Sequence, residues 1–199
     1  MDERNLNSRH GNSRLIFLIS GPSGVGKTTV VQRLLETIPE MAKIVTTTSR
    51  SRRPGEQDGV HYHFVSTQKF QDMIDHSKFI EWKSHLGHFY GLTWLAFCET
   101  SDRNAILDVD TQGKEDIIRR ISNRVVTIFL TPPSLDVAKD RLVRRGDLPN
   151  IELELRLDKA RQEVQSAGEY DHIVENAVLD STVDKICAII ADEILKQDN

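Results

Sequence analysis

The stretch GPSGVGKT, residues 21–28, places three glycines, one lysine and one hydroxyl residue at fixed spacing. Its glycines can adopt backbone angles that are closed to residues with a Cβ, so that successive N–H groups turn inward around an anion. Lys27 supplies a mobile positive charge for the outer phosphates of a nucleotide, and the Thr28 hydroxyl is placed to bind Mg²⁺. The motif therefore predicts a site for a nucleoside triphosphate. The alternative is an ordinary strand-to-helix turn, which needs only one or two glycines.

The elements predicted on either side of this stretch determine how specifically the motif indicates a phosphate-binding loop. The apolar run RLIFLIS precedes it, and TTVVQRLLETI, with apolar residues at helical spacing, follows it. A phosphate-binding loop requires a strand before it and a helix after it. The positive end of the helix dipole adds to the attraction of the loop for an anion.

Two carboxylates end another apolar run, AILDVD. Because side chains alternate along a strand, Asp108 and Asp110 are expected to project on the same side. The carboxyl end of a parallel strand is where ligands bind in open α/β sheets. Asp108 is a candidate for holding Mg²⁺, directly or through water, and Asp110 for contacting a second substrate. The alternative for Asp110 is a cap on the helix that follows.

Arginines gather in two places although the chain carries a formal net charge of −4. Arg50 and Arg53 precede a Pro-Gly turn, and arginine forks match the oxygens of a phosphate group. This pattern predicts a site for an anionic acceptor, with a solvated run of charges as the alternative. Arg141, Arg145 and Arg156 flank a Gly-Asp-Leu-Pro break between two helical patterns. Such a break suits a lid that brings cations over a phosphoryl group.

Composition limits the other classes of function. With 199 residues the chain can form one sizeable core, and its negative net charge disfavours a nucleic-acid-coating protein. Cys98 and Cys187 fit no metal-binding or disulfide framework, which favours a reducing cytoplasm. The apolar runs are too short to cross a membrane, so we expect no membrane partner. The sequence does not indicate the oligomeric state.

The order of the remaining elements predicts the fold class. Apolar β-rich runs at RLIFLIS, KIVTTT, AILDVD, VVTIFLTP and HIVEN alternate with amphipathic helical patterns, which indicates an α/β fold with a mostly parallel central sheet. Between HYHFVS and KFIEWKSHLGHFYG, short aromatic strands flank one small helix. This region is expected to form a small antiparallel insertion at the edge of the sheet.

Several separate motifs occur in the order typical of guanylate kinases, within the nucleoside monophosphate kinase group of P-loop proteins. They are SGPSGVGKTT, TTTSRSRRPGEQDGVHYHFVS, FIEW, FYG, ILDVDTQG, PPS and RLVRRG. The chain resembles this family from about Leu15 to Leu195. It differs from adenylate kinases, in which Gly-Thr typically follows the lysine of the loop.

The resemblance implies transfer of the γ-phosphoryl group of ATP to GMP, and to dGMP, with Mg²⁺ as the metal cofactor. It implies a P-loop three-layer α/β fold in which a tail, 1–13, precedes one domain, 14–199. The expected core is 14–46, 94–140 and 160–199, the GMP-binding insertion is 47–93 and the helical lid is 141–159.

The site residues expected on this basis form four sets. ATP is bound by Gly21, Pro22, Ser23, Gly24, Val25, Gly26, Lys27, Thr28, Thr29 and Asn176. GMP is bound by Thr46, Arg50, Arg53, Tyr62, Glu81, Tyr90, Thr93 and Asp110. Catalysis is expected of Lys27, Arg50, Arg141, Arg145 and Arg156, and the metal is held by Thr28 and Asp108. A carboxylate at Glu81 accepts hydrogen bonds from N1–H and the N2 amine of guanine, a pair that adenine lacks.

Three positions depart from the pattern of the family: Leu92 follows FYG where a small hydroxyl residue is usual, Ala177 follows VEN where an Asp is common, and the lid reads GDLPNIELELR. Two other functions stay open. One is a kinase of the same fold that acts on a phosphorylated sugar, which Leu92 favours and Glu81 and Thr46 disfavour. The other is a guanylate-kinase-like module that binds phosphorylated peptides, but such modules typically lose parts of the P-loop.

Overall fold

The structure is a computed structural model that describes residues 14–85, 87–121, 124–144 and 150–197. The expected tail, 1–13, and Arg145 lie outside these ranges. The chain divides into two compact units. The first unit comprises Met1–Ile16, Ala42–Leu107 and Gln112–Arg124, and the second comprises Phe17–Met41, Asp108–Thr111 and Val125–Asn199. The limits predicted for the insertion and the lid stay predictions.

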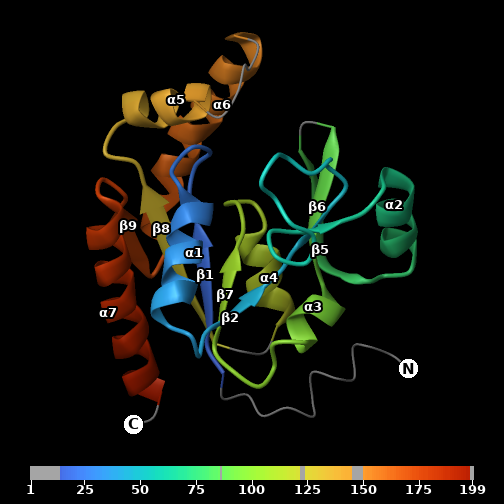
Figure 1. Cartoon of the computed structure of the whole chain (residues 1–199), viewed down its shortest axis with the longest axis horizontal. Helices are drawn as coiled ribbons and strands as arrows, with labels where there is room; N and C mark the ends of the chain where they lie inside the picture. The colour runs from blue at the N-terminus through green and yellow to red at the C-terminus, as the bar shows by residue number, and fades with distance from the viewer. Residues whose placement is uncertain (1–13, 86, 122–123, 145–149, 198–199) are drawn as a thin grey trace. The chain divides into compact units, whose positions relative to one another are not determined.

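A five-stranded sheet has the strand order β2-β7-β1-β8-β9. Its strands are β1 (Ile16–Ser20), β2 (Ala42–Ile44), β7 (Ala105–Asp108), β8 (Val125–Thr131) and β9 (His172–Glu175) (Figure 1). In the first unit β2 pairs in parallel with β7, and in the second unit β8 pairs in parallel with β9. The predicted α/β class with a mostly parallel central sheet is therefore confirmed.

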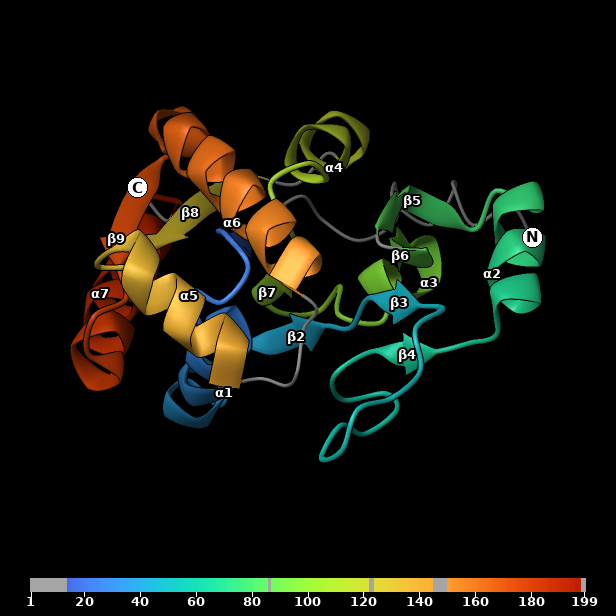
Figure 2. The same ribbon diagram turned by 90° about the horizontal axis from the view of Figure 1, so that it is seen from above.

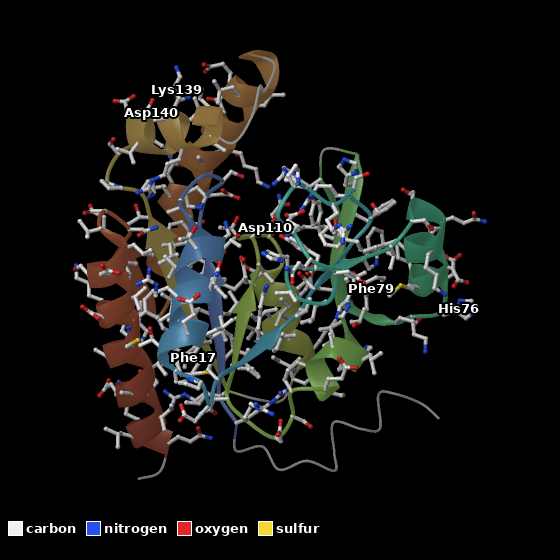
Figure 3. The ribbon with its side chains drawn as sticks, viewed as in Figure 1. Phe17, His76, Phe79, Asp110, Lys139 and Asp140 are labelled. Carbon is white, nitrogen blue, oxygen red and sulfur yellow. The ribbon has the colours of Figure 1, made fainter. Side chains whose placement is uncertain are left out.

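The strands form where apolar residues run without interruption. All five residues of β1 are buried, and Phe17, which Figure 3 labels, has no exposed surface. Strands buried on both faces show such continuous apolar runs instead of an alternation of apolar and polar residues. β1 ends directly before Gly21, so a rigid strand fixes the start of the phosphate loop.

Four long helices belong to the second unit: α1 (Lys27–Thr37), α5 (Leu135–Arg144), α6 (Asn150–Gln165) and α7 (Leu179–Gln197). Helix α7 packs against α1 and β9, and α5 packs beside α6 (Figure 2). Leu142 of α5 contacts Leu153 and Leu157 of α6 in a small apolar cluster. No helix in the described ranges has the length and apolarity needed to span a bilayer.

A second sheet, with the order β4-β3-β6-β5, belongs to the first unit. It consists of β3 (Thr47–Thr48), β4 (His63–Phe64), β5 (Phe79–His85) and β6 (His88–Thr93), and the same unit contains helices α2 (Thr67–Asp75), α3 (Trp94–Cys98) and α4 (Lys114–Arg120). The pairs β3–β6 and β5–β6 are antiparallel, as predicted. The pair β3–β4 is parallel, because the long connection over residues 49–62 returns the chain in the same direction.

The run KIVTTT shows where sequence patterns and structure differ. One strand was predicted there, but Ala42–Ile44 belongs to the five-stranded sheet and Thr47–Thr48 to the second sheet. The short helix α3 and a 3₁₀ turn at Ser166–Glu169 (η2) were not predicted either. Helix α3 and η2 contain five and four residues, which is less than two helical turns, so helical periodicity cannot mark them.

Candidate functional site

The loop between β1 and α1 has the backbone conformation that its glycines predict. Gly21, Gly24 and Gly26 have φ angles of +144°, +81° and +100°. Residues with a Cβ rarely adopt these angles. Space also excludes a side chain, since a methyl group at Gly24 would lie 2.9 Å from the carbonyl oxygen of Ala138. The loop is therefore a turn that only glycine can form at these positions.

Lys27 begins helix α1 and its ammonium group bends back over the loop. Its Nζ donates to the carbonyl oxygen of Gly21 at 2.6 Å and to that of Pro22 at 3.4 Å. Thr28 and Thr29 follow in the first helical turn and are exposed. A cation, exposed hydroxyl groups and the amino end of a helix thus meet at one loop, which is the arrangement expected of an anion site.

Two residues that are distant in sequence are brought to the same loop. Arg141 on α5 donates through Nη1 to the carbonyl oxygen of Val25 at 2.9 Å, and Asn176 after β9 donates through Nδ2 to the same oxygen at 2.7 Å. Arg141 also donates through Nη2 to the carbonyl oxygen of Asn176 at 3.1 Å. Both side chains thus lie beside the loop and donate to backbone carbonyl groups, and their expected roles toward ATP stay predictions.

Of the two aspartates expected to face the site, Asp108 is the last residue of β7 and Asp110 lies beyond the strand. Because β7 ends at Asp108, strand alternation does not set the direction of Asp110. The carboxylate of Asp110, labelled in Figure 3, lies 3.7 Å from Nζ of Lys159 on α6. Gly113 is the N-cap residue of α4 and has no side chain to cap the helix, so the alternative role of Asp110 as a cap stays open.

A buried glutamate of α6, which the sequence patterns did not single out, binds the segment that follows β7. Glu163 on α6 accepts a hydrogen bond from the Thr111 hydroxyl at 3.0 Å and lies 3.7 Å from Nζ of Lys159. The segment after β7 is thereby tied to α6. Arg156 belongs to α6, but its side chain, like Arg145 as a whole, lies outside what the structure describes. The catalytic roles expected of these two arginines stay predictions.

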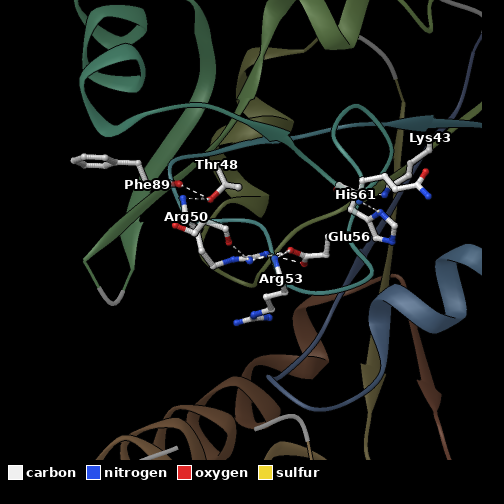
Figure 4. A network of polar contacts seen from close by, with 9 residues as sticks. Lys43, Thr48, Arg50, Arg53, Glu56, His61 and Phe89 are labelled. Atoms are coloured by element: carbon white, nitrogen blue, oxygen red, sulfur yellow. Dashed lines mark hydrogen bonds and ion pairs between the residues drawn. The ribbon is translucent and has the colours of Figure 1, made fainter. Parts of the chain in front are cut away.

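In the first unit, Arg50 is paired with a glutamate that the sequence analysis did not single out. Its Nη1 and Nη2 donate to the two carboxylate oxygens of Glu56 at 2.9 and 2.8 Å (Figure 4). Glu56 also accepts from the backbone N–H of Arg53 at 2.7 Å. The Arg50 backbone N–H donates to the Thr48 hydroxyl at 3.2 Å. Glu56 therefore fixes the loop that contains both arginines.

This ion pair changes the protonation behaviour of both partners. Burial alone would lower the pKa of Arg50, but the hydrogen bond and charge of Glu56 outweigh it and raise that pKa. Burial alone would raise the pKa of Glu56, but hydrogen bonds from Arg50 and from the Arg53 backbone lower it. Both groups stay charged near neutral pH, and Arg50 is a fixed cation that is 9% exposed.

Aromatic rings surround the Arg50 guanidinium. Its central carbon lies 5.6 Å from the ring centroid of Tyr62 and 5.7 Å from that of Phe64. Tyr90 contacts Tyr62 edge to face, with ring centroids 6.3 Å apart. Of the residues expected to bind GMP, the structure thus brings together Arg50, Tyr62 and Tyr90. Arg53 is exposed on the same loop as Arg50.

Glu81 is the most unusual titratable group of the first unit. It is 7% exposed, and among the described residues no donor forms a hydrogen bond with its carboxylate. A register irregularity between Phe79 and Glu81 interrupts the alternation of β5, so that three consecutive residues are buried. Burial raises the pKa of Glu81, and the charge of Lys83 opposes this shift. A mostly buried carboxylate that accepts no hydrogen bond is unusual in proteins, which makes Glu81 a candidate for binding a hydrogen-bond donor.

A glycine provides the space for this carboxylate. A methyl group at Gly113, just before α4, would lie 3.1 Å from the carboxyl carbon of Glu81 and 3.2 Å from both oxygens. Gly91 pairs with Trp82, the residue after Glu81, and a methyl group at Gly91 would be 2.8 Å from the Glu81 carbonyl oxygen. Both glycines belong to motifs quoted above, TQG and FYG, but no pattern along the chain showed that they face Glu81.

The remaining expected GMP ligands also have structural roles. The Thr93 hydroxyl caps α3 by accepting from the Ala96 N–H at 3.1 Å, and Thr93 is buried. The carbonyl oxygen of Thr46 accepts from the His63 N–H at 2.8 Å. Leu92 is completely buried, so this departure from the family pattern fills the core. No observation tests the contacts of Thr46 and Thr93 with a substrate.

Together, the glycine loop at the start of α1 and the mostly parallel sheet define the class of the protein, which is that of α/β proteins with a phosphate-binding P-loop. The family model for guanylate kinase matches residues 13–193. The chain belongs to the guanylate kinase family.

Individual relatives cover nearly the whole chain. It is 36% identical over 190 residues to a guanylate kinase of Desulfitobacterium hafniense, which covers 94% of this chain and 93% of that protein. It is 39% identical over 188 residues to a guanylate kinase of Brucella melitensis, covering 92% and 85%. The crystal structure of guanylate kinase from Anaplasma phagocytophilum has a TM-score of 0.73 and 29% identity, covering 92% of this chain and 87% of that one.

Proposed function

We propose that this protein transfers the γ-phosphoryl group of ATP to GMP, and also to dGMP, giving ADP and GDP or dGDP. The observation that supports GMP as the acceptor is the buried carboxylate of Glu81. It is 7% exposed and accepts no hydrogen bond from the part of the chain that the structure describes, whereas guanine offers two donors, N1–H and the N2 amine. Adenine in its place would leave the carboxylate unpaired, so the discrimination between the two bases is expected to be large.

The phosphate group of GMP is assigned to the loop that contains Arg50 and Arg53. Glu56 holds Arg50 by two hydrogen bonds, which fixes the direction of its guanidinium before a substrate arrives. The hydroxyl groups of Tyr62 and Tyr90 complete this set. A fixed cation costs less reorganisation on binding than a mobile one.

The reaction needs charge neutralisation and alignment, and no general base. The acceptor is a phosphate oxygen that is ionised near neutral pH, because its second pKa is about 6. Lys27 is bent over the phosphate loop, where it neutralises the outer phosphates of ATP. Arg141, Arg145 and Arg156 are proposed to add positive charge during transfer. Such catalysis consists of holding the two nucleotides in line.

The proposed Mg²⁺ would be held by the hydroxyl of Thr28 and the carboxylate of Asp108. Both offer the oxygen ligands that Mg²⁺ prefers, with Thr28 exposed and Asp108 partly exposed. In the part of the chain that the structure describes, no group of three His, Cys, Asp or Glu could hold a metal ion. This fits an ion that takes most of its ligands from nucleotide phosphates and water. When bound, Mg²⁺ would neutralise charge on the β- and γ-phosphates.

We assign this activity to purine nucleotide metabolism in the cytoplasm, with small-molecule nucleotides as partners. Within the described residues, neither Cys98 nor Cys187 forms a disulfide, in keeping with a reducing compartment. The sugar-phosphate alternative loses its main support because Leu92 is part of the core.

A coupled assay of ADP formation tests the proposal. ATP is offered with GMP, dGMP, AMP, UMP and ribose 5-phosphate in turn. We expect turnover with GMP and dGMP, and rates at least about 100-fold lower with AMP and UMP, because a mismatched base leaves Glu81 unpaired. Equal turnover with ribose 5-phosphate would contradict the proposal.

A further inference from the structure

The carbonyl oxygen of Val25, inside the phosphate loop, accepts two hydrogen bonds from distant side chains. Asn176 donates from 2.7 Å and Arg141 from 2.9 Å. A carbonyl oxygen has two lone pairs, so both acceptor positions are filled. Asn176 is 5% exposed, and loss of this bond would leave a buried amide without its acceptor.

The direction of this carbonyl fixes the direction of the next N–H group. The peptide bond between Val25 and Gly26 is trans and planar, so the Gly26 N–H points opposite to the Val25 carbonyl. Within the described residues, no acceptor takes this N–H. The carbonyl points to Asn176 and Arg141, and the N–H therefore points the other way, as an anion-binding loop requires.

Neither the backbone angle at Gly26 nor the space around it would accept a residue with a side chain. Its φ of +100° is open to glycine, and a methyl group there would lie 2.7 Å from Nδ2 of Asn176. Its own carbonyl oxygen accepts from the Val30 N–H at 3.1 Å as α1 begins. The positive charge of Arg141 polarises the Val25–Gly26 peptide group, which makes the N–H a stronger donor.

We infer that Asn176 and Arg141 are positioning residues for the phosphate loop: by holding the Val25 carbonyl, they direct the Gly26 N–H at a phosphate group of the bound nucleotide. This rests on the proposed function only in that the loop binds a polyphosphate. It differs from the roles expected from the family resemblance, in which Asn176 binds ATP directly and Arg141 acts on the transferred phosphoryl group during catalysis.

Inorganic tripolyphosphate has phosphates but no base, so it separates the loop role of Asn176 from a contact with the base. The NMR shift of the Gly26 amide proton separates the loop role of Arg141 from a direct contact with phosphate. Calorimetry would measure its dissociation constant, and that of ATP, for the wild-type chain, Asn176→Ala and Arg141→Lys. Arg141→Lys retains the charge but loses the fork that reaches two carbonyl groups. Arg33→Lys is the matched control, because Arg33 pairs with Asp180 on the surface of the same unit at 3.2 Å.

We expect both variants to bind tripolyphosphate about 10-fold more weakly, which corresponds to one charge-assisted hydrogen bond, and to lose ATP affinity by the same factor. The control should match the wild-type chain. In NMR spectra, tripolyphosphate should shift the Gly26 amide proton of the wild-type chain, and this shift should be smaller in both variants. A purely stabilising role would lower the melting temperature without changing that shift.

Unchanged affinity for tripolyphosphate in both variants, with weaker ATP binding, would overturn the inference and place the two side chains at the adenosine. Should Asn176→Ala fail to fold, Arg141→Lys decides by the same two measurements. GMP phosphorylation does not enter this test. A wild-type chain that binds tripolyphosphate but does not phosphorylate GMP would contradict the proposed function and leave this inference intact.

Discussion

The phosphate loop of the second unit and the acceptor site proposed in the first unit differ in the groups that they present. The loop presents backbone N–H groups, whose directions depend on glycine angles and on two side chains that hold the Val25 carbonyl. The acceptor site presents side chains: Glu81 is buried beside two close glycines, and Arg50 is held by an ion pair with Glu56. The backbone angles of the loop are encoded locally, whereas a site made of side chains depends on residues that only the fold brings together.

The largest loss of activity is expected for substitution of Lys27, whose side chain adds a positive charge to the phosphate loop. Lys27→Ala removes a cation that neutralises the outer phosphates of ATP, and kcat should fall at least about 100- to 1000-fold. The ammonium also donates to the Gly21 carbonyl, so circular dichroism should confirm that the fold survives. Lys139→Ala, at an exposed position of α5 labelled in Figure 3, is the control. A Lys27→Ala enzyme with wild-type kcat would show that the backbone groups suffice.

Glu81→Gln should weaken GMP binding far more than ATP binding. The amide has the size of the carboxyl group but presents one acceptor, so one guanine donor loses its partner. KM for GMP should rise about 10- to 100-fold, and KM for ATP should stay within about twofold. Glu99→Gln, at an exposed glutamate of the same unit, is the control. Equal changes in both KM values would remove Glu81 as the residue that recognises the base.

Removal of the buried charge should also change stability. The pKa of Glu81 is raised in the folded state, so the wild-type chain loses stability as pH rises from the ordinary glutamate pKa through the raised one. At pH 7 the melting temperature of Glu81→Gln should equal or exceed that of the wild-type chain by a few degrees. A clearly lower value would mean that the ionised carboxylate stabilises the fold.

Gly113→Ala should have a smaller effect on GMP. The backbone angles at Gly113, φ −80° and ψ −16°, suit alanine, so any effect comes from the methyl group beside the Glu81 carboxylate. A displacement of a few tenths of an ångström should raise KM for GMP about 3- to 10-fold. Gly168→Ala is the control, because a methyl group at Gly168 would meet nothing within 4 Å. The same KM in both variants would show that Glu81 can shift without loss.

The smallest expected effect is a pH dependence limited to GMP. As pH falls through the raised pKa of Glu81, the carboxyl group gains a proton and loses an acceptor, so kcat/KM for GMP should fall. The charges of Lys83, Asp116 and Arg120 act on the same group. GMP itself titrates near pH 6, so the wild-type profile is compared with that of Glu81→Gln. Identical profiles would contradict a role for the Glu81 charge.

The sequence alone determined the parts of this protein that depend on neighbours along the chain. The phosphate loop, the buried strand before it and helix α1 after it follow from glycine angles and apolar periodicity, which act over a few residues. Arg50 and Glu81 were singled out by residue type and family motif. Their surroundings were not predicted.

The contacts that fix the phosphate loop and Glu81 in place were decided by the tertiary structure. The Val25 carbonyl is bound by side chains 116 and 151 residues away in the sequence. Glu81 is buried because an irregularity in β5 turns it inward, and Gly113, from a separate segment, leaves space for it. Such contacts depend on which segments meet when the chain packs, and no spacing along the chain records that.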